Sequence, residues 1–198
     1  MESNFCGSWV CGNEKLVVQK NGKTFSCSLP RKNIGIVFDK ALVVSEFDNE
    51  TPSAGVGVYS PIGDGYSISA LWSSKETAGR VGSGFALKHD GVPEFIGEYS
   101  VKYFEETRES GAFIVKIDAT ANKNIYKLSW FLEDKNVLHG IGMIVNKSLA
   151  FSWGHTDCKL GFSMFSLCEK NNSKWLVRHI VKWDSPKIEC CDYINVQT

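Results

Sequence analysis

The stretch IGIVFDKALVVSEF at residues 34–47 recurs as IGMIVNKSLAFSWG at residues 141–154. Isoleucine, glycine, lysine, leucine and serine keep the same positions in both stretches, with an offset of 107 residues between Ile34 and Ile141. Farther along, AGVGVYS at 54–60 matches LGFSMFS at 160–166. This internal duplication predicts two domains of similar fold, because about 100 residues are enough for each copy to bury its own core.

Each copy divides into about eight short runs of β-branched or alternating apolar residues. Clusters of Gly, Asn, Asp or Ser separate the runs, at the spacing that antiparallel barrels and sandwiches show. The sequence therefore predicts an all-β protein made of two tandem eight-stranded antiparallel up-and-down barrels related by internal duplication.

The strand pattern lapses around KHDGVP at residues 88–93. We therefore expect the first barrel in residues 1–92 and the second in residues 93–198. A linker of about five residues is too short for independent tumbling, so the two barrels should touch.

The charge of the chain is balanced, with 22 Lys and Arg against 22 Asp and Glu. Without a basic face there is no electrostatic reason to expect nucleic acid or an anionic membrane as a partner. No apolar run approaches the roughly 18 residues of a transmembrane helix.

The N-terminal MESNFCGSWVCG lacks the positive start and apolar run of a signal peptide. The seven cysteines are odd in number, show no C-x-x-C spacing and do not recur at matched positions in the two copies. Reduced thiols and a cytoplasmic, soluble protein are therefore expected.

Period-two alternation assigns the side chains of each strand to two faces. In the run 175–183 it predicts one inward face made of Trp175, Val177, His179, Val181 and Trp183. In the duplicated stretch, Glu46 and Trp153 occupy equivalent positions, each on the same face as the apolar residues two and four positions before it.

Gly7-Ser8-Trp9 opens the first strand, and a meander of about eight antiparallel strands follows. This pattern resembles the G-x-W opening of the calycin superfamily and, at this size, the avidin and streptavidin-like barrels; Gly97-Glu98-Tyr99 is the softened counterpart in the second copy. The chain is also similar to duplicated bacterial proteins of uncharacterised function. The resemblance implies barrels that are either filled by their own side chains or hold one small ligand in the mouth. The avidin-type positions that give Asn and Ser to biotin fall on Cys11 and Lys15, so biotin recognition does not carry over.

We expect the ligand-binding residues to be His179, Trp153, Trp175, Trp183 and Glu46. His179 interrupts an apolar row, where an imidazole either contacts a ligand or is a core histidine with a satisfied hydrogen bond. The tryptophans either line a pocket or pack in the core, and Glu46 either faces a barrel mouth or reaches solvent.

A cluster of His155, Asp157 and Cys158 is the type that binds a metal or builds a nucleophile. Three residues within four positions do not converge easily, and no second cluster completes a tetrahedral site. We therefore expect neither a metal nor another cofactor.

No phosphate-binding loop, nucleophile elbow or zinc-protease motif occurs in the chain. The sequence favours a non-enzymatic binding protein that holds a small apolar ligand in a barrel mouth or an inter-barrel groove. The alternative is a protein-interaction module, such as an inhibitor or immunity-type protein, acting through loops or that groove. An isomerase or hydrolase of calycin-like fold ranks third, because it requires two titratable groups converging in one pocket. The identity of the ligand or partner and any homo-oligomerisation stay open.

Overall fold

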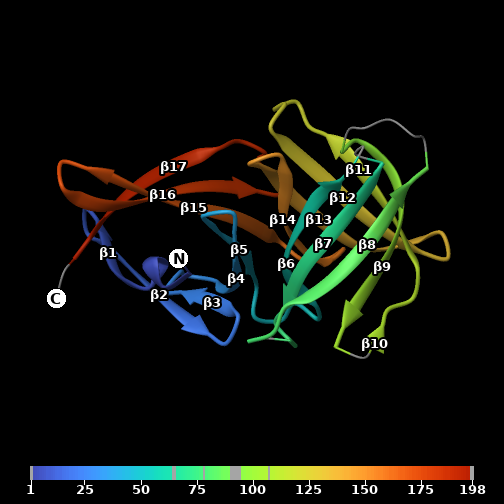
Figure 1. The fold of residues 1–198 in the computed structure, drawn as a ribbon, viewed down its shortest axis with the longest axis horizontal. Helices are drawn as coiled ribbons and strands as arrows, with labels where there is room; N and C mark the ends of the chain where they lie inside the picture. The colour runs from blue at the N-terminus through green and yellow to red at the C-terminus, as the bar shows by residue number, and fades with distance from the viewer. Residues whose placement is uncertain (1, 64–65, 78, 90–94, 107, 197–198) are drawn as a thin grey trace.

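The computed structural model describes residues 2–63, 66–77, 79–89, 95–106 and 108–196, and over these ranges the protein is built almost entirely of strands (Figure 1). A short 3-10 turn, η1 (Glu2–Phe5), precedes β1 (Gly7–Cys11), β2 (Glu14–Asn21), β3 (Thr24–Cys27), β4 (Lys32–Phe38), β5 (Ala41–Phe47), β6 (Ala54–Ile62), β7 (Ser67–Ser74) and β8 (Gly82–Lys88). The later strands are β9 (Gly97–Glu105), β10 (Arg108–Glu109), β11 (Phe113–Ala119), β12 (Ile125–Leu132), β13 (Lys135–Val145), β14 (Ser148–His155), β15 (Leu160–Lys170), β16 (Ser173–Lys182) and β17 (Glu189–Asn195). Within these ranges no helix is long and apolar enough to cross a membrane.

The strands form two closed antiparallel barrels. In barrel A the order is β1-β17-β16-β15-β5-β4-β3-β2. In barrel B the order is β9-β11-β12-β13-β14-β6-β7-β8, closed by the pairing of β8 with β9, and the short β10 extends β9. The prediction of an all-β fold with two eight-stranded antiparallel barrels is confirmed.

Neither barrel coincides with one half of the chain. Barrel A combines β1–β5 with β15–β17, so residues 7–47 and 160–195 lie together, as the blue and red strands show in Figure 1. Barrel B takes the strands from β6 to β14. This corrects the expected division into a barrel of residues 1–92 and a barrel of residues 93–198; the expected junction itself falls in residues 90–94, outside the described part of the chain.

The correction has a physical reason in the duplication. By register, β1–β8 are equivalent to β9 and β11–β17, and each copy places its first five strands in one barrel and its last three in the other. β5 therefore pairs with β15, and its equivalent β14 pairs with β6. The exchange occurs in the short connections 48–53 and 156–159, where each copy passes from one barrel to the other.

The two copies meet around a pseudo-two-fold axis. The hydroxyl oxygens of Ser45 and its equivalent Ser152 lie 2.6 Å apart and are buried. The amide of Asn146 donates to the carbonyl oxygen of its equivalent, Asp39, at 3.2 Å. Contacts between equivalent residues are the mark of a two-fold arrangement.

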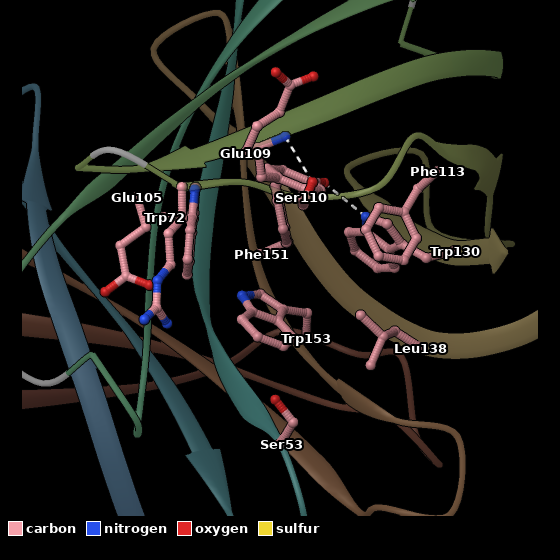
Figure 2. Close-up of a pocket in the computed structure, with 12 residues that line it drawn as sticks. Ser53, Trp72, Glu105, Glu109, Ser110, Phe113, Trp130, Leu138, Phe151 and Trp153 are labelled. Carbon is pink, nitrogen blue, oxygen red and sulfur yellow. Dashed lines mark hydrogen bonds between the residues drawn. The ribbon is translucent and has the colours of Figure 1, made fainter.

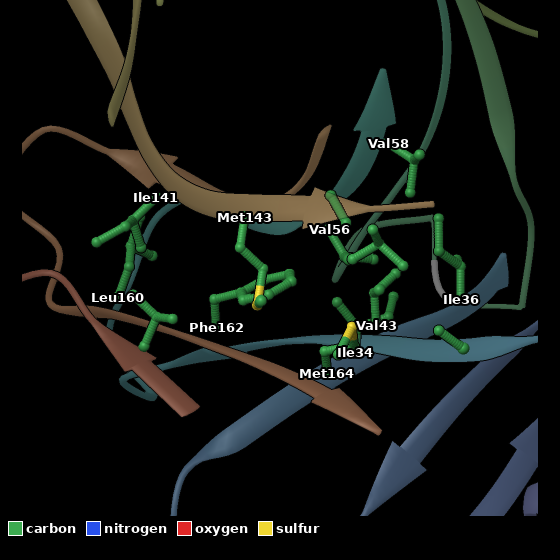
Figure 3. Packing of buried hydrophobic residues seen from close by; sticks show 14 of the residues in the cluster. Ile34, Ile36, Val43, Val56, Val58, Ile141, Met143, Leu160, Phe162 and Met164 are labelled. Carbon is green, nitrogen blue, oxygen red and sulfur yellow. The ribbon is translucent and has the colours of Figure 1, made fainter. Parts of the chain in front are cut away.

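A packed apolar core fills the space between the barrels, and Figure 3 shows its centre. This inter-barrel core is drawn from the outer faces of both barrels and includes Ile34, Ile36, Val43, Val56, Val58, Ile141, Met143, Leu160, Phe162 and Met164. All seven residues of β5 are buried, because one face points into barrel A and the other into this core. A strand buried on both faces is mostly apolar, and the two polar residues of β5, Ser45 and Glu46, each have a buried hydrogen-bond partner.

The two copies of the duplicated stretch contain equivalent tight turns, and each turn begins with Asp or Asn. Asp39-Lys40 and Asn146-Lys147 have positive φ at both residues, between 41° and 68°. Positive φ at both central residues defines the type I′ turn, which matches the twist of an antiparallel hairpin. The duplicated stretch therefore folds as the same hairpin, β4–β5 and β13–β14, in both copies.

We expect the two halves of the chain to need each other. Residues 1–92 supply five strands to one barrel and three to the other, so neither half closes the observed barrels alone. When 1–92 and 93–198 are co-expressed as separate polypeptides, native mass spectrometry should find a 1:1 complex, and each half alone should be unfolded or self-associated. Two halves that are each folded and monomeric would contradict the exchange.

Candidate functional site

A cavity of about 300 Å³ opens in the mouth of barrel B. Figure 2 shows its aromatic wall, with Trp153 near the centre and Trp130, Phe113 and Phe151 around it. The lining residues come from both copies of the duplication and are Ser53, Trp72, Tyr103, Glu105, Arg108, Glu109, Ser110, Phe113, Trp130, Leu138, Phe151 and Trp153.

Glycines of neighbouring strands make room for the aromatic rings of this wall. Trp153 lies opposite Gly55 and Phe151 lies opposite Gly57 in the β14–β6 pair. A Cβ atom on Gly55 would come within 2.7 Å of the Trp153 ring, and one on Gly57 within 2.5 Å of the Phe151 ring. Aromatic rings that cover cross-strand glycines in this way fix the register of a sheet and hold the ring in place.

Three polar groups meet at the aromatic wall. The indole Nε1 of Trp130 donates to the hydroxyl oxygen of Tyr103 at 2.7 Å, and the hydroxyls of Tyr103 and Tyr59 hydrogen-bond to each other. Burial raises the pKa of Tyr103 to about 12. Burial, with the nearby Tyr103 as a smaller cause, also raises the pKa of Tyr59.

This triad has one donor hydrogen more than it can use. Both hydroxyls are protonated near neutral pH, so the triad holds three donor hydrogens, and its two hydrogen bonds use only two of them. No other partner for either hydroxyl is found among the described residues. Tyr103 lines the cavity, whereas Tyr59 is 1% exposed. The spare hydrogen is therefore satisfied best when Tyr59 donates to Tyr103 and Tyr103 donates to an acceptor in the cavity.

The equivalent position in barrel A holds a buried charged pair. There the position of Trp153 is taken by Glu46, which lies opposite Gly161 as Trp153 lies opposite Gly55. The carboxylate of Glu46 accepts hydrogen bonds from Ser163 Oγ and Arg178 Nη2, each at 2.6 Å. Arg178 corresponds by register to Ala70 of barrel B, so barrel A carries a long charged side chain where barrel B carries a buried alanine.

The ion pair in barrel A is buried, with Glu46 and Arg178 each 8% exposed. Burial alone would lower the pKa of Arg178, but the Glu46 carboxylate and the Tyr193 hydroxyl together outweigh it and raise that pKa. Arg178 also donates from Nε to Ser163 Oγ at 3.1 Å. The site is a satisfied internal network with its charge compensated.

The expected inward face of residues 175–183 is wrong. Leu176 and Arg178 are the buried residues that face the interior of barrel A, so Trp175 and His179 lie on the outer face of β16, and Trp183 follows directly after the strand. The outer face reads as apolar because Val181 and Trp183 pack on the inter-barrel core. Arg178 can be buried in the interior of barrel A because the Glu46 carboxylate compensates its charge.

The five expected ligand residues therefore do not form one site. Trp153 lines the cavity of barrel B, and Glu46 lies within barrel A rather than at a solvated strand end. Trp183 lies under the Nζ of Lys127 at 4.5 Å, and its ring is 4.1 Å from that of His139. Trp175 Nε1 and His179 Nδ1 are buried and have no hydrogen-bond partner within the described ranges.

Sequence reasoning missed Tyr103, Phe113 and Arg108, which line the cavity from the β9–β11 region. Their role depends on a rim that barrel A lacks: β1 turns directly into β2 after Cys11, whereas β9 continues to Glu105 and is extended by β10. A usable signal was present for Tyr103, because Gly82 and Gly84 recur at period two and Gly84 lies opposite Tyr103 in the β8–β9 pair.

The His155, Asp157 and Cys158 cluster does not converge on a metal site. His155 Nδ1 lies 3.5 Å from Asp157 Oδ2, and Cys158 is buried in the inter-barrel core. Across the described residues no group of three His, Cys, Asp or Glu side chains is placed to hold a metal ion. All seven cysteines are free thiols.

Removing one member of the buried pair should cost far more than removing both. Arg178→Met leaves the Glu46 carboxylate buried without its cation, which typically lowers the free energy of unfolding by about 3–5 kcal/mol. In Arg178→Met combined with Glu46→Leu, no charge stays buried, so most of that loss should be recovered. Urea unfolding followed by circular dichroism measures both, and equal losses would show that the pair is not coupled.

Alkaline pH should weaken the fold through the tyrosine pair. An unfolded chain ionises its tyrosines near the ordinary pKa of 10.0, whereas folding holds the proton of Tyr103 up to about pH 12. The contribution is fully present below pH 10 and is lost as the pH rises toward 12. The urea midpoint of the wild-type protein should therefore fall from pH 9 to pH 10 and pH 11. The midpoint of Tyr103→Phe should be lower than that of the wild type at pH 9, but it should fall less steeply with pH. Parallel slopes would contradict this assignment.

No protein-family model, no curated protein and no solved structure matches the chain. The assignment of two closed barrels is based on the strand pairing described above. The closer likeness to avidin-type or calycin barrels is an interpretation of the sequence motifs.

Proposed function

We propose that the protein is a non-enzymatic binding protein that holds a small, mainly apolar ligand in the mouth of barrel B. The observation that carries the proposal is the difference between the two barrels. At equivalent positions barrel A carries the buried Glu46–Arg178 pair, whereas in barrel B Trp153 lines a cavity of about 300 Å³. A cavity of this size that is lined by aromatic side chains and a few polar groups is typical of small-molecule sites.

The barrel mouth is favoured over the inter-barrel groove. The space between the barrels is occupied by the inter-barrel core. A second hollow lies where β2–β5 of barrel A meet Lys75 and Glu76 after β7, but mostly polar and charged side chains line it. An apolar ligand buries more apolar surface among the tryptophans of barrel B.

Avidin-like barrels hold their ligand in the barrel mouth, and this likeness supports the same location here. The polar groups of the first copy differ from those of a biotin site. The positions at which avidin-type barrels place Asn and Ser hold Cys11 and Lys15 in this chain. In barrel B the polar inner group is instead the Tyr103 hydroxyl. The proposal therefore takes the location of the ligand from the likeness and its chemistry from these residues.

A protein-interaction module is the second candidate, and one surface favours it. Five apolar side chains are 36% to 52% exposed on the outer wall of barrel B, namely Leu71, Phe85, Leu87, Phe104 and Ile114. They lie on β7, β8, β9 and β11, and clusters of exposed apolar residues often mark contact surfaces. Native mass spectrometry of protein purified from its source separates the two candidates: a small co-purifying mass supports the ligand, and a second polypeptide or a second copy supports the interaction.

The uncharged fluorophore N-phenyl-1-naphthylamine tests the cavity directly. We expect it to bind one site, with a rise in its own emission and quenching of tryptophan. Trp153→Ala should weaken binding about tenfold or more, because burial and stacking against an indole contribute about 1.5–3 kcal/mol. Trp175→Ala removes an indole from the outer face of barrel A and is the matched control. Equal effects of the two substitutions would reject the cavity as the binding site.

A further inference from the structure

Three charged side chains lie at the rim of the barrel B cavity, and the two carboxylates among them have ion-pair partners outside it. Glu105 forms an ion pair with Arg80 at 2.8 Å, and Glu109 forms one with Lys102 at 2.6 Å. Neither Arg80 nor Lys102 lines the cavity. Arg80 also pairs with Glu106 at 3.1 Å, so these ion pairs reduce the repulsion between the rim carboxylates and an anionic ligand only in part.

Arg108 is the third charged group and the sole cation among the residues that line the cavity. It is exposed and sits across from Glu105 in the β9–β10 pair. Within the part of the chain that the structure describes, its guanidinium has neither an ion-pair nor a hydrogen-bond partner. A guanidinium offers five donors in a planar fork that matches carboxylate, sulfonate and phosphate oxygens.

The inner wall supplies a second recognition element. The hydrogen-bond count of the Tyr59, Tyr103 and Trp130 triad leaves one hydroxyl hydrogen for an acceptor in the cavity. The rings of Trp72, Phe113 and Trp153 line the same cavity. The cavity thus combines a neutral donor, aromatic rings and the exposed cation of Arg108.

We propose that the ligand of barrel B is an aromatic anion, with its ring system among the tryptophans and its anionic group paired with Arg108. The inference rests on the proposed function, since it names the chemical class of the ligand for the same cavity. The Tyr103 hydroxyl donates a hydrogen bond to an acceptor atom on the buried part of the ligand. The anionic group stays at the rim, where its remaining oxygens keep contact with water and little desolvation is required.

Two probes that share one ring system test this class. 8-Anilino-1-naphthalenesulfonate carries an anionic group, and N-phenyl-1-naphthylamine has the same rings without it. In low salt the wild-type protein should bind the sulfonate about tenfold more tightly than the amine, because an ion pair to an available guanidinium adds to the same ring burial. The preference should shrink at about 1 M salt, where charges are screened over about 3 Å.

Arg108→Gln is the decisive variant, because Arg108 is an exposed rim residue and its loss should leave the barrel folded. We expect it to weaken binding of the sulfonate about tenfold and to leave the amine within about twofold of wild type. Lys123→Gln removes one positive charge from the turn between β11 and β12 and is the control for net charge; it should change neither affinity.

The outcomes separate the two proposals. If the amine binds and Trp153→Ala abolishes its binding, but Arg108→Gln leaves the sulfonate affinity unchanged, the anionic class is overturned and the cavity remains the binding site. A sulfonate affinity that falls equally in Lys123→Gln and Arg108→Gln also overturns it, because net charge alone then explains the preference. If neither probe depends on Trp153, the proposed function fails and the inference fails with it.

Discussion

The contact on which the fold depends is the one between two equivalent serines. Ser45 and Ser152 meet at 2.6 Å where β5 and β14 cross between the barrels. Each hydroxyl is fully buried and is satisfied by its own counterpart, so the polar atom that each copy carries into the inter-barrel core has a partner only because the other copy is present. The same strands each close a barrel with a strand from the other copy. Association of the copies and closure of the barrels are therefore one event.

The exchange of strands lets two similar copies build two dissimilar interiors. Each barrel receives five strands from one copy and three from the other, so an interior depends on residues far apart in the chain. In barrel A, Glu46 from β5 of the first copy meets Arg178 from β16 of the second. In barrel B the equivalent positions hold Trp153 and Ala70. The two interiors therefore differ in kind: barrel A buries a charged pair, and barrel B has an aromatic cavity lined by Trp153.

Much of the fold can be predicted from the sequence, because the duplicated stretch, the period-two runs and the turn residues act locally. The exchange cannot be predicted from these signals. β6 and β15 are equivalent strands, so the pairing of β5 with either one satisfies the same alternation and the same burial. Only the connections 48–53 and 156–159 differ between a closed copy and an exchanged one, and their composition does not determine which arrangement is made.

The site shows a sharper limit. Trp153 was predicted correctly to share a face with Leu149 and Phe151, because that strand faces a barrel interior of ordinary apolar kind. The face of His179 was assigned wrongly, since hydrophobicity alone favours the row with two tryptophans over the row with Arg178. The row that contains His179 is apolar because Val181 and Trp183 pack on the inter-barrel core. The charge of Arg178 is compensated by Glu46, more than a hundred residues away in the sequence. Non-local compensation of this kind leaves no periodic trace in the sequence.

Barrel A also bears on how barrel B should be understood. Barrel A places a buried, hydrogen-bonded charged pair at the positions equivalent to Trp153 and Ala70, so the aromatic lining of barrel B is determined by its side chains and not by the number of strands. Barrel B adds an extended β9 and the short β10, which place Tyr103, Arg108 and Ser110 around the opening. The rim formed by β9 and β10 and the aromatic cavity therefore occur in the same barrel. The arrangement makes structural sense if something other than the chain completes the packing of Trp153 and the hydrogen bonding of Tyr103.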